Sequence, residues 1–311
     1  MMMTIAMAII PDTQIAAWQH PEVLRQMAKW IVDHREDYRI EMVLHLGDVV
    51  HLGANDERQF QDAKAALDMI DEAGVPMLIV PGNHDYDNLL NEDRSLDMFR
   101  HYFGVSRLAG REWLRGLYEQ GKPENAYAVI ESNGLQLLFI ALEFGPRDEV
   151  LAWADGLLAT YEDHHAIIVT HCYLYLDATP SKLGDEYNPR DYAGAEGAND
   201  GEEMWKKCFR KHRNIIAIYS GHQIPYSISY SVAIGDHGNP VFQSFQNWQG
   251  ADKGGSGRFR LVTMNGQAGV LKHMVINPML DGAEAGDGHE VEFCFREIDR
   301  SRLEQTKYSP L

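Results

Sequence analysis

The chain has few cysteines. Cys172, Cys208 and Cys294 are the three among 311 residues, too few for a disulfide framework or a four-cysteine zinc site. This usage excludes the disulfide-rich class of secreted domains and is typical of a reducing compartment. We therefore expect a cytoplasmic protein.

Basic residues are scarce relative to acidic ones. Lys and Arg number 28 and Asp and Glu number 46, so the net charge is −18. Such a charge repels the phosphate backbone of nucleic acids unless a metal ion or a local basic patch intervenes. A nucleic-acid polymer is therefore a disfavoured partner.

Long apolar runs are also lacking. No stretch reaches the roughly 20 apolar residues that a membrane-spanning helix needs. Residues 1–10 are apolar but contain no Lys or Arg and no small-residue cleavage site, so they predict a buried first strand rather than a signal peptide. We expect a soluble protein without a membrane partner.

Predicted strands and helices alternate through the first two-thirds of the chain. Strands are predicted at 5–10, 42–46, 75–80, 127–131, 135–142, 166–170 and 215–220, and helices at 21–35, 57–73, 94–102, 149–160 and 202–212. The second helix is expected to end at Gly74, and Asn133-Gly134 predicts a hairpin turn. Such alternation indicates βαβ units and a largely parallel sheet.

The last third has a different pattern. Five predicted strands, at 226–234, 241–245, 257–264, 269–276 and 290–298, are separated by turns rich in Gly and Asp, which favours antiparallel pairing. Residues 178–201 have no clear periodicity and form the longest predicted loop, and loops of this length are usually functional or mobile. Without linkers or repeats, residues 1–311 are interpreted as one α/β domain with two packed sheets, the last third supplying mainly antiparallel strands of the second sheet.

Possible metal ligands follow the parallel-type strands. Asp12-Thr13-Gln14 follows the first, Gly47-Asp48 the second, Gly82-Asn83-His84-Asp85 the third, and His171 and Gly221-His222 follow two later ones. The carboxyl ends of parallel strands form the binding edge of open α/β sheets, so these loops are expected to converge. The spacings of 36 residues from Asp12 to Asp48 and 35 from Asp48 to Asn83 each match one crossover unit.

This ordered set resembles the calcineurin-like metallophosphoesterase superfamily, with its signature Asp-x-His, Gly-Asp, Gly-Asn-His-Asp/Glu, His and Gly-His-x-His. The resemblance covers residues 5–224, and the Asp-Thr-Gln opening and residues 142–149 are similar to a bacterial branch of the family. It implies a two-sheet β-sandwich flanked by helices (αββα), with a dinuclear metal site at the carboxyl-terminal ends of the strands.

The resemblance also implies the ligands. Asp48 would bridge two metal ions, Asp12 would hold the first, and Asn83, His171 and His222 would complete the second. Two positions depart from the pattern, since Gln14 and Ile224 stand where histidines are usual. Both departures fall on the first metal, so that site is expected to be weaker, with His51 or His237 as possible replacement ligands.

The implied chemistry is metal-dependent hydrolysis of a small phosphoester, either a monoester or a diester. Two metal ions ionise a bridging water, which attacks phosphorus, and they stabilise charge on the phosphoryl oxygens. Mixed nitrogen and oxygen ligands suit Mn, Fe, Co, Ni or Zn, and the weaker site favours a harder ion such as Mn or Mg. His84 is the expected general acid for the leaving oxygen, and Asp85 is expected to orient it.

Other readings stay open on the sequence alone. The eroded first site also fits a protein of this fold that binds without turnover, and a nuclease is the less favoured third reading because of the acidic charge. Arg147 and Arg190 are candidate phosphate contacts, and Trp18, Tyr173 and Tyr187 are candidate borders of the cleft. The sequence indicates neither the substrate nor an oligomeric state, and residues 87–121 and 178–201 are the expected specificity segments.

Overall fold

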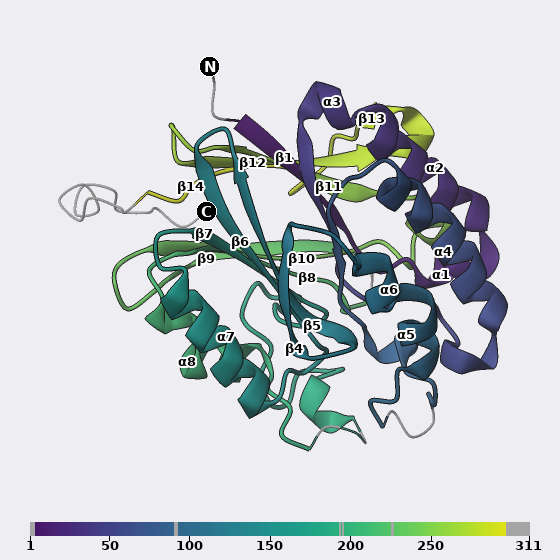
Figure 1. The fold of residues 1–311 in the computed structure, drawn as a ribbon, viewed down its shortest axis with the longest axis horizontal. Helices are drawn as coiled ribbons and strands as arrows, with labels where there is room; N and C mark the ends of the chain where they lie inside the picture. The colour runs from purple at the N-terminus through teal and green to yellow at the C-terminus, as the bar shows by residue number, and fades with distance from the viewer. Residues whose placement is uncertain (1–3, 90–92, 193, 195, 225–226, 297–311) are drawn as a thin grey trace.

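The computed structural model describes residues 4–89, 93–192, 194, 196–224 and 227–296 (Figure 1). The first half of the chain contains β1 (Thr4–Ile10), α1 (Gln14–Gln19), α2 (Pro21–Asp33), α3 (Arg35–Tyr38), β2 (Ile40–His45), α4 (Glu57–Glu72), β3 (Met77–Ile79), α5 (Asp97–Phe103), α6 (Val105–Leu108), β4 (Leu114–Glu119), β5 (Lys122–Ser132) and β6 (Leu135–Leu142). The second half contains α7 (Asp148–Thr160), β7 (His165–Thr170), α8 (Gly201–Lys207), β8 (Ile215–Ser220), β9 (Ser227–Ile234), β10 (Pro240–Asn247), α9 (Asp252–Gly255), β11 (Phe259–Asn265), β12 (Val270–Asn277), β13 (Gly282–Ala283) and β14 (Glu290–Cys294).

The strands of the described residues form two seven-stranded sheets. One has the order β13-β12-β11-β1-β2-β3 with β14 beside β12, and the other has the order β4-β5-β6-β7-β8-β10-β9. The parallel pairs are β1–β2–β3 at one end of the first sheet and β6–β7–β8–β10 in the middle of the second. The predicted α/β sandwich with two helix-flanked sheets is confirmed.

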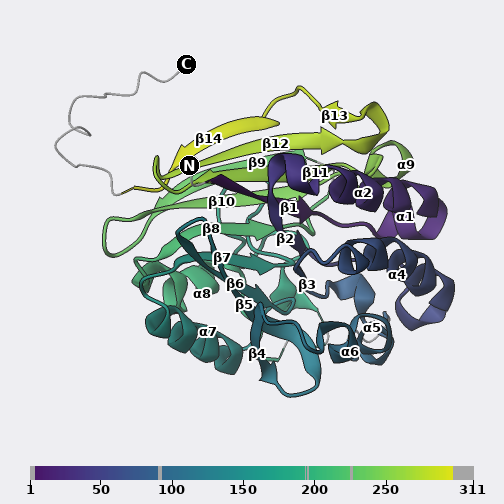
Figure 2. The same cartoon turned by 45° about the horizontal axis from the view of Figure 1, so that its top comes forward.

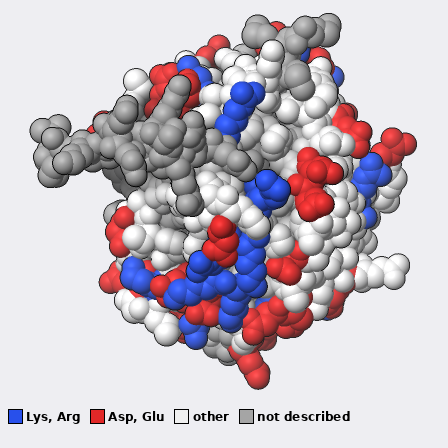
Figure 3. Space-filling model, turned by 90° about the vertical axis from the view of Figure 1, so that its left-hand side faces the viewer, with Lys and Arg blue, Asp and Glu red and all other residues white. Residues whose placement is uncertain are grey.

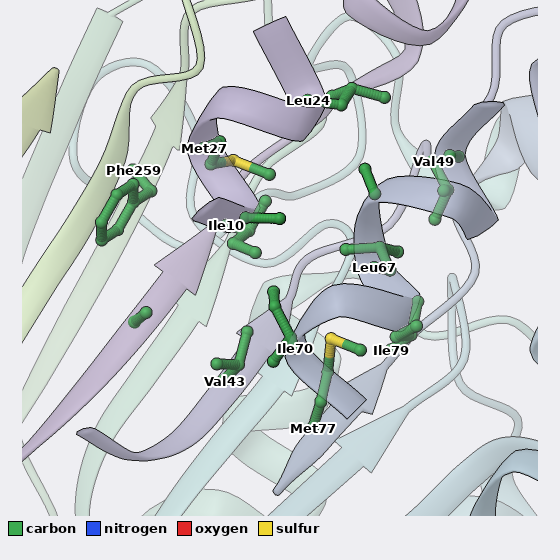
Figure 4. Close-up of a cluster of buried hydrophobic side chains, with 14 of the residues drawn as sticks. Ile10, Leu24, Met27, Val43, Val49, Leu67, Ile70, Met77, Ile79 and Phe259 are labelled. Carbon is green, nitrogen blue, oxygen red and sulfur yellow. The ribbon is translucent and has the colours of Figure 1, made fainter. Parts of the chain in front are cut away.

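Three apolar layers hold this arrangement together. Side chains between the sheets include Met7, Leu44 and Phe139, all fully buried. A second layer packs α2 and α4 onto the first sheet, with Met27 and Ile70 among its members (Figure 4). A third packs α7 and α8 onto the second sheet, so the two groups of helices lie on opposite sides of the molecule (Figure 2). Strands buried on both faces explain the continuous apolar runs in the sequence.

The hairpin predicted at Asn133-Gly134 is confirmed. Strands β5 and β6 pair antiparallel up to Ser132 and Leu135, which leaves these two residues as the loop. Their φ values are +52° and +76°. A two-residue loop with both φ positive matches the twist of the flanking strands, and Asn-Gly tolerates that conformation best.

Other element predictions need correction. The helix predicted at 202–212 ends as α8 at Lys207, and a short 3-10 turn, Phe209–Lys211, follows it. Some of the predicted segments lie partly outside the described residues. This applies to two predicted strands, at residue 226 and at residues 297–298, and to the two specificity segments, at residues 90–92 and at residues 193 and 195. No helix in the described ranges is long and apolar enough to cross a membrane.

The prediction that the last third belongs mainly to the second sheet is wrong in part. Strands β9 and β10 join that sheet, whereas β11 pairs antiparallel with β1, and β12, β13 and β14 extend the first sheet from there. The reason is that β1 is buried along almost its whole length, so the backbone groups on its edge away from β2 need partners, and β11 provides them. Strand β10 pairs antiparallel with β9 and thereby runs parallel to β8.

Candidate metal centre

The loops that follow β1, β2, β3, β7 and β8 meet at one edge of the sandwich. Ligand atoms of Asp48, His171 and His222 lie within 4.8 Å of one another, and all three side chains are buried. The backbone N–H of His222 donates to Asp12 Oδ1 at 3.1 Å, and the backbone N–H of His84 donates to Asp48 Oδ1 at 2.9 Å. The structure therefore brings together strand-end residues that are separated by up to 210 positions.

Backbone carbonyls orient both buried imidazoles. Nδ1 of His171 donates to the Leu46 carbonyl at 2.7 Å, and Nε2 of His222 donates to the Tyr187 carbonyl at 2.8 Å. Because a carbonyl oxygen only accepts, each ring must hold its proton on that side. The remaining nitrogens, His171 Nε2 and His222 Nδ1, face each other at 3.1 Å. Such outer hydrogen bonds are the usual way in which proteins orient histidine ligands of metals.

A metal ion fits this set of donors. His171 Nε2 also lies 3.3 Å from Asp48 Oδ1. Asn83 Oδ1 is buried without a hydrogen-bond partner among the described residues, and Asn83 lines the same cavity as Asp48 and His222. Two imidazole lone pairs, a carboxylate and an unpartnered amide oxygen are all electron-pair donors, and a buried group of this kind is costly unless a cation satisfies it. The mixed nitrogen and oxygen set suits a transition-metal dication.

The charges within the group are strongly coupled. Burial opposes the change in each case, but Asp48 raises the pKa of His171 to about 9, and the His171 and His84 charges hold the pKa of Asp48 well below its usual range. Burial and the His171 charge lower the pKa of His222 to about 3. These shifts show that the side chains around Asp48 favour positive charge between them.

The backbone at these positions is unusual in ways that bring the loops close. Asp48 and His222 have φ values of +50° and +77°, a region that residues other than glycine rarely adopt and that costs about 1–3 kcal/mol. A Cβ on Gly82 would lie 2.1 Å from Asp48 Oδ1, and one on Gly221 would lie 2.1 Å from Asp12 Oδ1. Glycine at these two positions is therefore required by the close approach of the carboxylates.

Around Asp12 the atoms that could bind a metal ion are mostly oxygen atoms. Its carboxylate accepts from the Asn247 amide at 3.0 Å, and burial raises the pKa of Asp12 to about 7. The Gln14 amide donates to Gln249 Oε1, while Gln14 Oε1 is buried without a partner among the described residues. Ile224 is 39% exposed on the wall of the same cavity and offers no donor.

Asn247 and Gln249 are site residues that the sequence analysis missed. They come at and just beyond the end of β10, which had been interpreted as one of the antiparallel strands of the last third. Because β10 runs parallel to β8, its carboxyl end reaches the same edge as His222. The strand-end rule would have found both residues had that pairing been known.

His84 lies at the cavity with its tautomer fixed from behind. Its Nδ1 donates to the His51 carbonyl at 2.8 Å, so Nε2 is the nitrogen left for the cavity that His84 lines. The His84 ring stacks on His51 at a centroid distance of 4.9 Å, and His51 stacks on Trp18 at 4.8 Å. A ring held in this way is positioned to exchange a proton with a bound molecule.

The prediction that Asp85 orients His84 is wrong. The Asp85 carboxylate accepts backbone N–H groups from Gly82 at 2.8 Å, Val50 at 3.0 Å and Val49 at 3.2 Å, and the residue is fully buried. Burial raises the pKa of Asp85 to about 7, and the Asp48 charge adds to this. Asp85 therefore ties the loop after β3 to the loop after β2, and the His51 carbonyl takes the orienting role.

The remaining candidates are the possible replacement ligands and the possible phosphate contacts. His51 lines the cavity, but His237 lies in the β9–β10 turn and bonds the Lys211 carbonyl, at the opposite end of these strands from Asn247, so His237 as a replacement ligand is wrong. Arg147 pairs with Glu143 at 2.8 Å, and Arg190 with Asp200 at 3.5 Å.

A cavity of about 480 Å³ opens on these donors. Besides the polar residues already named, its described wall contains Ile15, Tyr187, Tyr192, Ile224 and Gly250. Tyr187 is 45% exposed there, whereas Tyr173, the other tyrosine expected at the cleft, is fully buried. The volume is that of a small-molecule site, and polar side chains of the metal centre share its lining with apolar and aromatic ones.

Asp155, Cys208 and His212 form a second group of possible ligands, between α7 and the end of α8, with atoms within 4.8 Å of one another. The His212 ring donates to Asp155 at 2.9 Å, so two of the three are already partnered. Burial raises the pKa of the Cys208 thiol to about 12, which disfavours the thiolate that binds metals. Metal titrations still need to control for this group.

Comparisons with known proteins agree with the geometry. A family model described as calcineurin-like phosphoesterase matches residues 6–226. The uncharacterized protein YvnB of Bacillus subtilis strain 168 is 28% identical over 268 residues, which are 85% of this chain and 19% of YvnB. The chain thus spans about a fifth of the length of the curated relative it matches. A dimetal phosphatase from Danio rerio shares the fold, with a TM-score of 0.51 and 12% identity over 94% of this chain and 99% of the other.

Replacing one imidazole of the buried group tests whether it binds metal. His171→Ala removes a donor from a buried site, so the tight binding of Mn²⁺ should weaken at least about 100-fold, since even the loss of an outer partner costs 10–100-fold. Isothermal titration calorimetry of the apoprotein measures this. The matched control is His212→Ala in the second group of possible ligands, which should leave the tight binding of Mn²⁺ unchanged. Equal losses in both variants would assign the binding elsewhere.

Proposed function

The protein belongs to the calcineurin-like phosphoesterase family, and from this premise we propose that it is a metal-dependent hydrolase of small phosphoesters. The observation that carries the proposal is the convergence of buried metal-binding side chains, Asp48, Asn83, His171 and His222, beside the ring nitrogen of His84 that faces the cavity. A binding site for a dication next to a proton donor is what hydrolysis of a phosphoester requires.

In this proposal the residues divide into two ligand sets. Asp48, Asn83, His171 and His222 would hold one ion, and Asp12, Gln14 and Asp48 would hold the other. When bound, the ions supply positive charge for the phosphoryl oxygens and lower the pKa of a water molecule. Because the set around Asp12, the first site, contains only oxygen donors, we propose that it takes a harder ion such as Mn²⁺.

His84 would protonate the leaving group. Its Nδ1 proton is committed to the His51 carbonyl, so the imidazolium form presents the Nε2 proton to the cavity. The backbone N–H of the same residue donates to Asp48, which fixes the ring relative to the donor group. An ester oxygen that departs within hydrogen-bond distance of Nε2 would leave as an alcohol rather than as an alkoxide.

A binding protein without turnover is the second candidate. The absence of an imidazole at positions 14 and 224 favours it, whereas the held His84 ring favours an enzyme, because a binding site has no need of a proton donor. A nuclease is less favoured. The net charge is −18, and on the face shown in Figure 3 the Lys and Arg side chains lie among Asp and Glu rather than in a purely basic patch. We propose a cytoplasmic enzyme acting on small molecules.

Metal removal tests the proposed activity directly. Hydrolysis of p-nitrophenyl esters of phosphate should disappear after EDTA treatment and dialysis, because no positive charge then balances the charge on the phosphoryl oxygens. Added Mn²⁺ should restore the activity. Release of p-nitrophenolate is followed by absorbance. Activity that survives with no metal detected by elemental analysis would end the proposal, and absence of activity with metal bound would favour the binding protein.

The proton donor is tested with leaving groups of different basicity. His84→Ala should lower kcat by about 10²–10⁴ on alkyl phosphoesters, because an alkoxide needs protonation, and much less on p-nitrophenyl esters, whose anion leaves unaided. His101→Ala, which removes an exposed imidazole on α5, is the matched control and should change neither. An equal loss on both substrates, or loss of metal, would assign His84 a structural or ligand role.

Unequal binding of the two ions is the third test. Mn²⁺ titrated into the Cys208→Ser apoprotein should bind in two steps, and the second, weaker step should restore activity. Ile224→His returns an imidazole beside the Asp12 set and should tighten the second step by about tenfold, equivalent to roughly 1.4 kcal/mol. Two equally tight ions in the unmodified chain would contradict the proposal and would indicate that a further side chain, such as His51 or Gln249, completes the first site.

A further inference from the structure

The cavity at the metal centre has two different walls. One carries His84, stacked on His51, which in turn stacks on Trp18. The other carries His222 together with Tyr187, Tyr192 and Ile224, with ring centroids of the two tyrosines 6.3 and 6.0 Å from that of His222. The leaving group belongs on the first wall, because its oxygen must reach His84. The second wall is then left for whatever else the phosphorus atom carries.

The second wall offers apolar surface beside His222. Ile224 and Tyr187 are 39% and 45% exposed, so their apolar surfaces are available to a ligand. No lining residue among those described is Lys or Arg. Arg190, in the same loop as Tyr187, is paired with Asp200, and Arg94 donates to the carbonyls of Phe144 and Gly145.

This wall distinguishes the two classes of phosphoester. A monoester carries two negative charges on three terminal oxygens at neutral pH, and an oxygen facing Ile224 would be desolvated without a donor to replace water, which is costly. A diester carries one charge on two terminal oxygens, and its second ester group is an organic group that gains from contact with an isoleucine and aromatic rings.

We propose that the substrate is a phosphodiester monoanion whose second, non-leaving ester group is apolar or aromatic and packs against Tyr187 and Ile224. The inference rests on the proposed function and adds the substrate class to it. Ile224 then has a positive role. Where the family pattern has a histidine, this chain has a hydrophobic contact for the retained half of the substrate.

Three substrates with the same leaving group test the proposal. Bis(p-nitrophenyl) phosphate has an aromatic second ester group, methyl p-nitrophenyl phosphate has a small one, and p-nitrophenyl phosphate has none and one more charge. The expected order of kcat/KM in Mn²⁺ is bis(p-nitrophenyl), then methyl, then the monoester. The first step should be roughly tenfold, the size that an aromatic contact supplies, and the second step reflects the extra charge that the monoester brings to the apolar wall. A monoester that is hydrolysed as well as the diesters overturns the proposal.

Variants of Tyr187 test whether its ring makes the contact with the second ester group. Tyr187→Ala should lower the ratio of bis(p-nitrophenyl) to methyl ester about tenfold, and Tyr187→Phe should keep it, because the contact is made by the ring. Tyr230→Ala, at an exposed tyrosine on β9 outside the described lining, is the matched control. Ile224→Arg should raise kcat/KM for the monoester relative to both diesters. A Tyr187→Ala variant with an unchanged ratio contradicts the proposed contact.

A binding measurement keeps this result distinct from failure of the proposed function. If none of the three esters is hydrolysed, the hydrolase proposal has failed, and calorimetry with diphenyl phosphate and phenyl phosphate in Mn²⁺ still tests the wall. Diphenyl phosphate should bind at least about tenfold more tightly than phenyl phosphate, and Tyr187→Ala should remove the difference. Tighter binding of phenyl phosphate would overturn the inference.

Discussion

Two buried imidazole nitrogens and a carboxylate oxygen that face one another are stabilised by a proton or a metal ion that lies between them. The structure enforces this arrangement, because the carbonyls of Leu46 and Tyr187 accept one N–H of each ring and so turn the other ring nitrogens toward each other. Close approach of the loops follows from it, including positive φ at Asp48 and His222 and glycine at 82 and 221. Strain of this kind persists only where surrounding packing holds it, and the three apolar layers around the two sheets supply that packing.

The sequence was sufficient to predict the fold class and the edge at which the site forms, and the reason is geometric. Parallel strands bring their carboxyl ends to one edge, so a polar residue after each apolar run can be placed without knowing any side-chain contact. The same rule failed at β10. Its pairing with β8 depends on which strands lie side by side, and the turns on either side of it indicate only antiparallel neighbours. Asn247 and Gln249 therefore could not be predicted as site residues, although Asn247 contacts Asp12 and Gln249 contacts Gln14.

Asp85 illustrates a different limit. Adjacency to His84 in the chain suggested a hydrogen bond between the two side chains, but in a 3-10 turn consecutive side chains point in different directions. The carboxylate of Asp85 turns inward to three backbone N–H groups and the ring of His84 turns outward to the cavity. Whether a carboxylate beside a histidine orients the ring or holds the loop depends on unsatisfied backbone donors nearby, and these are not visible in the sequence.

Tyr187 connects the metal centre to the substrate wall. Its carbonyl accepts the Nε2 proton of His222, so it keeps Nδ1 of that ring turned toward Asp48 and His171, while its exposed side chain lines the cavity. The residue lies in the long loop without periodicity, 178–201, and has a φ of +58°, a conformation rarely adopted by a bulky side chain. A loop of low regularity thus orients one ligand through its backbone and forms the apolar wall through its side chain. Changes to the tyrosine ring can therefore alter the choice of ester without altering the ligand, because the two roles use different atoms of one residue.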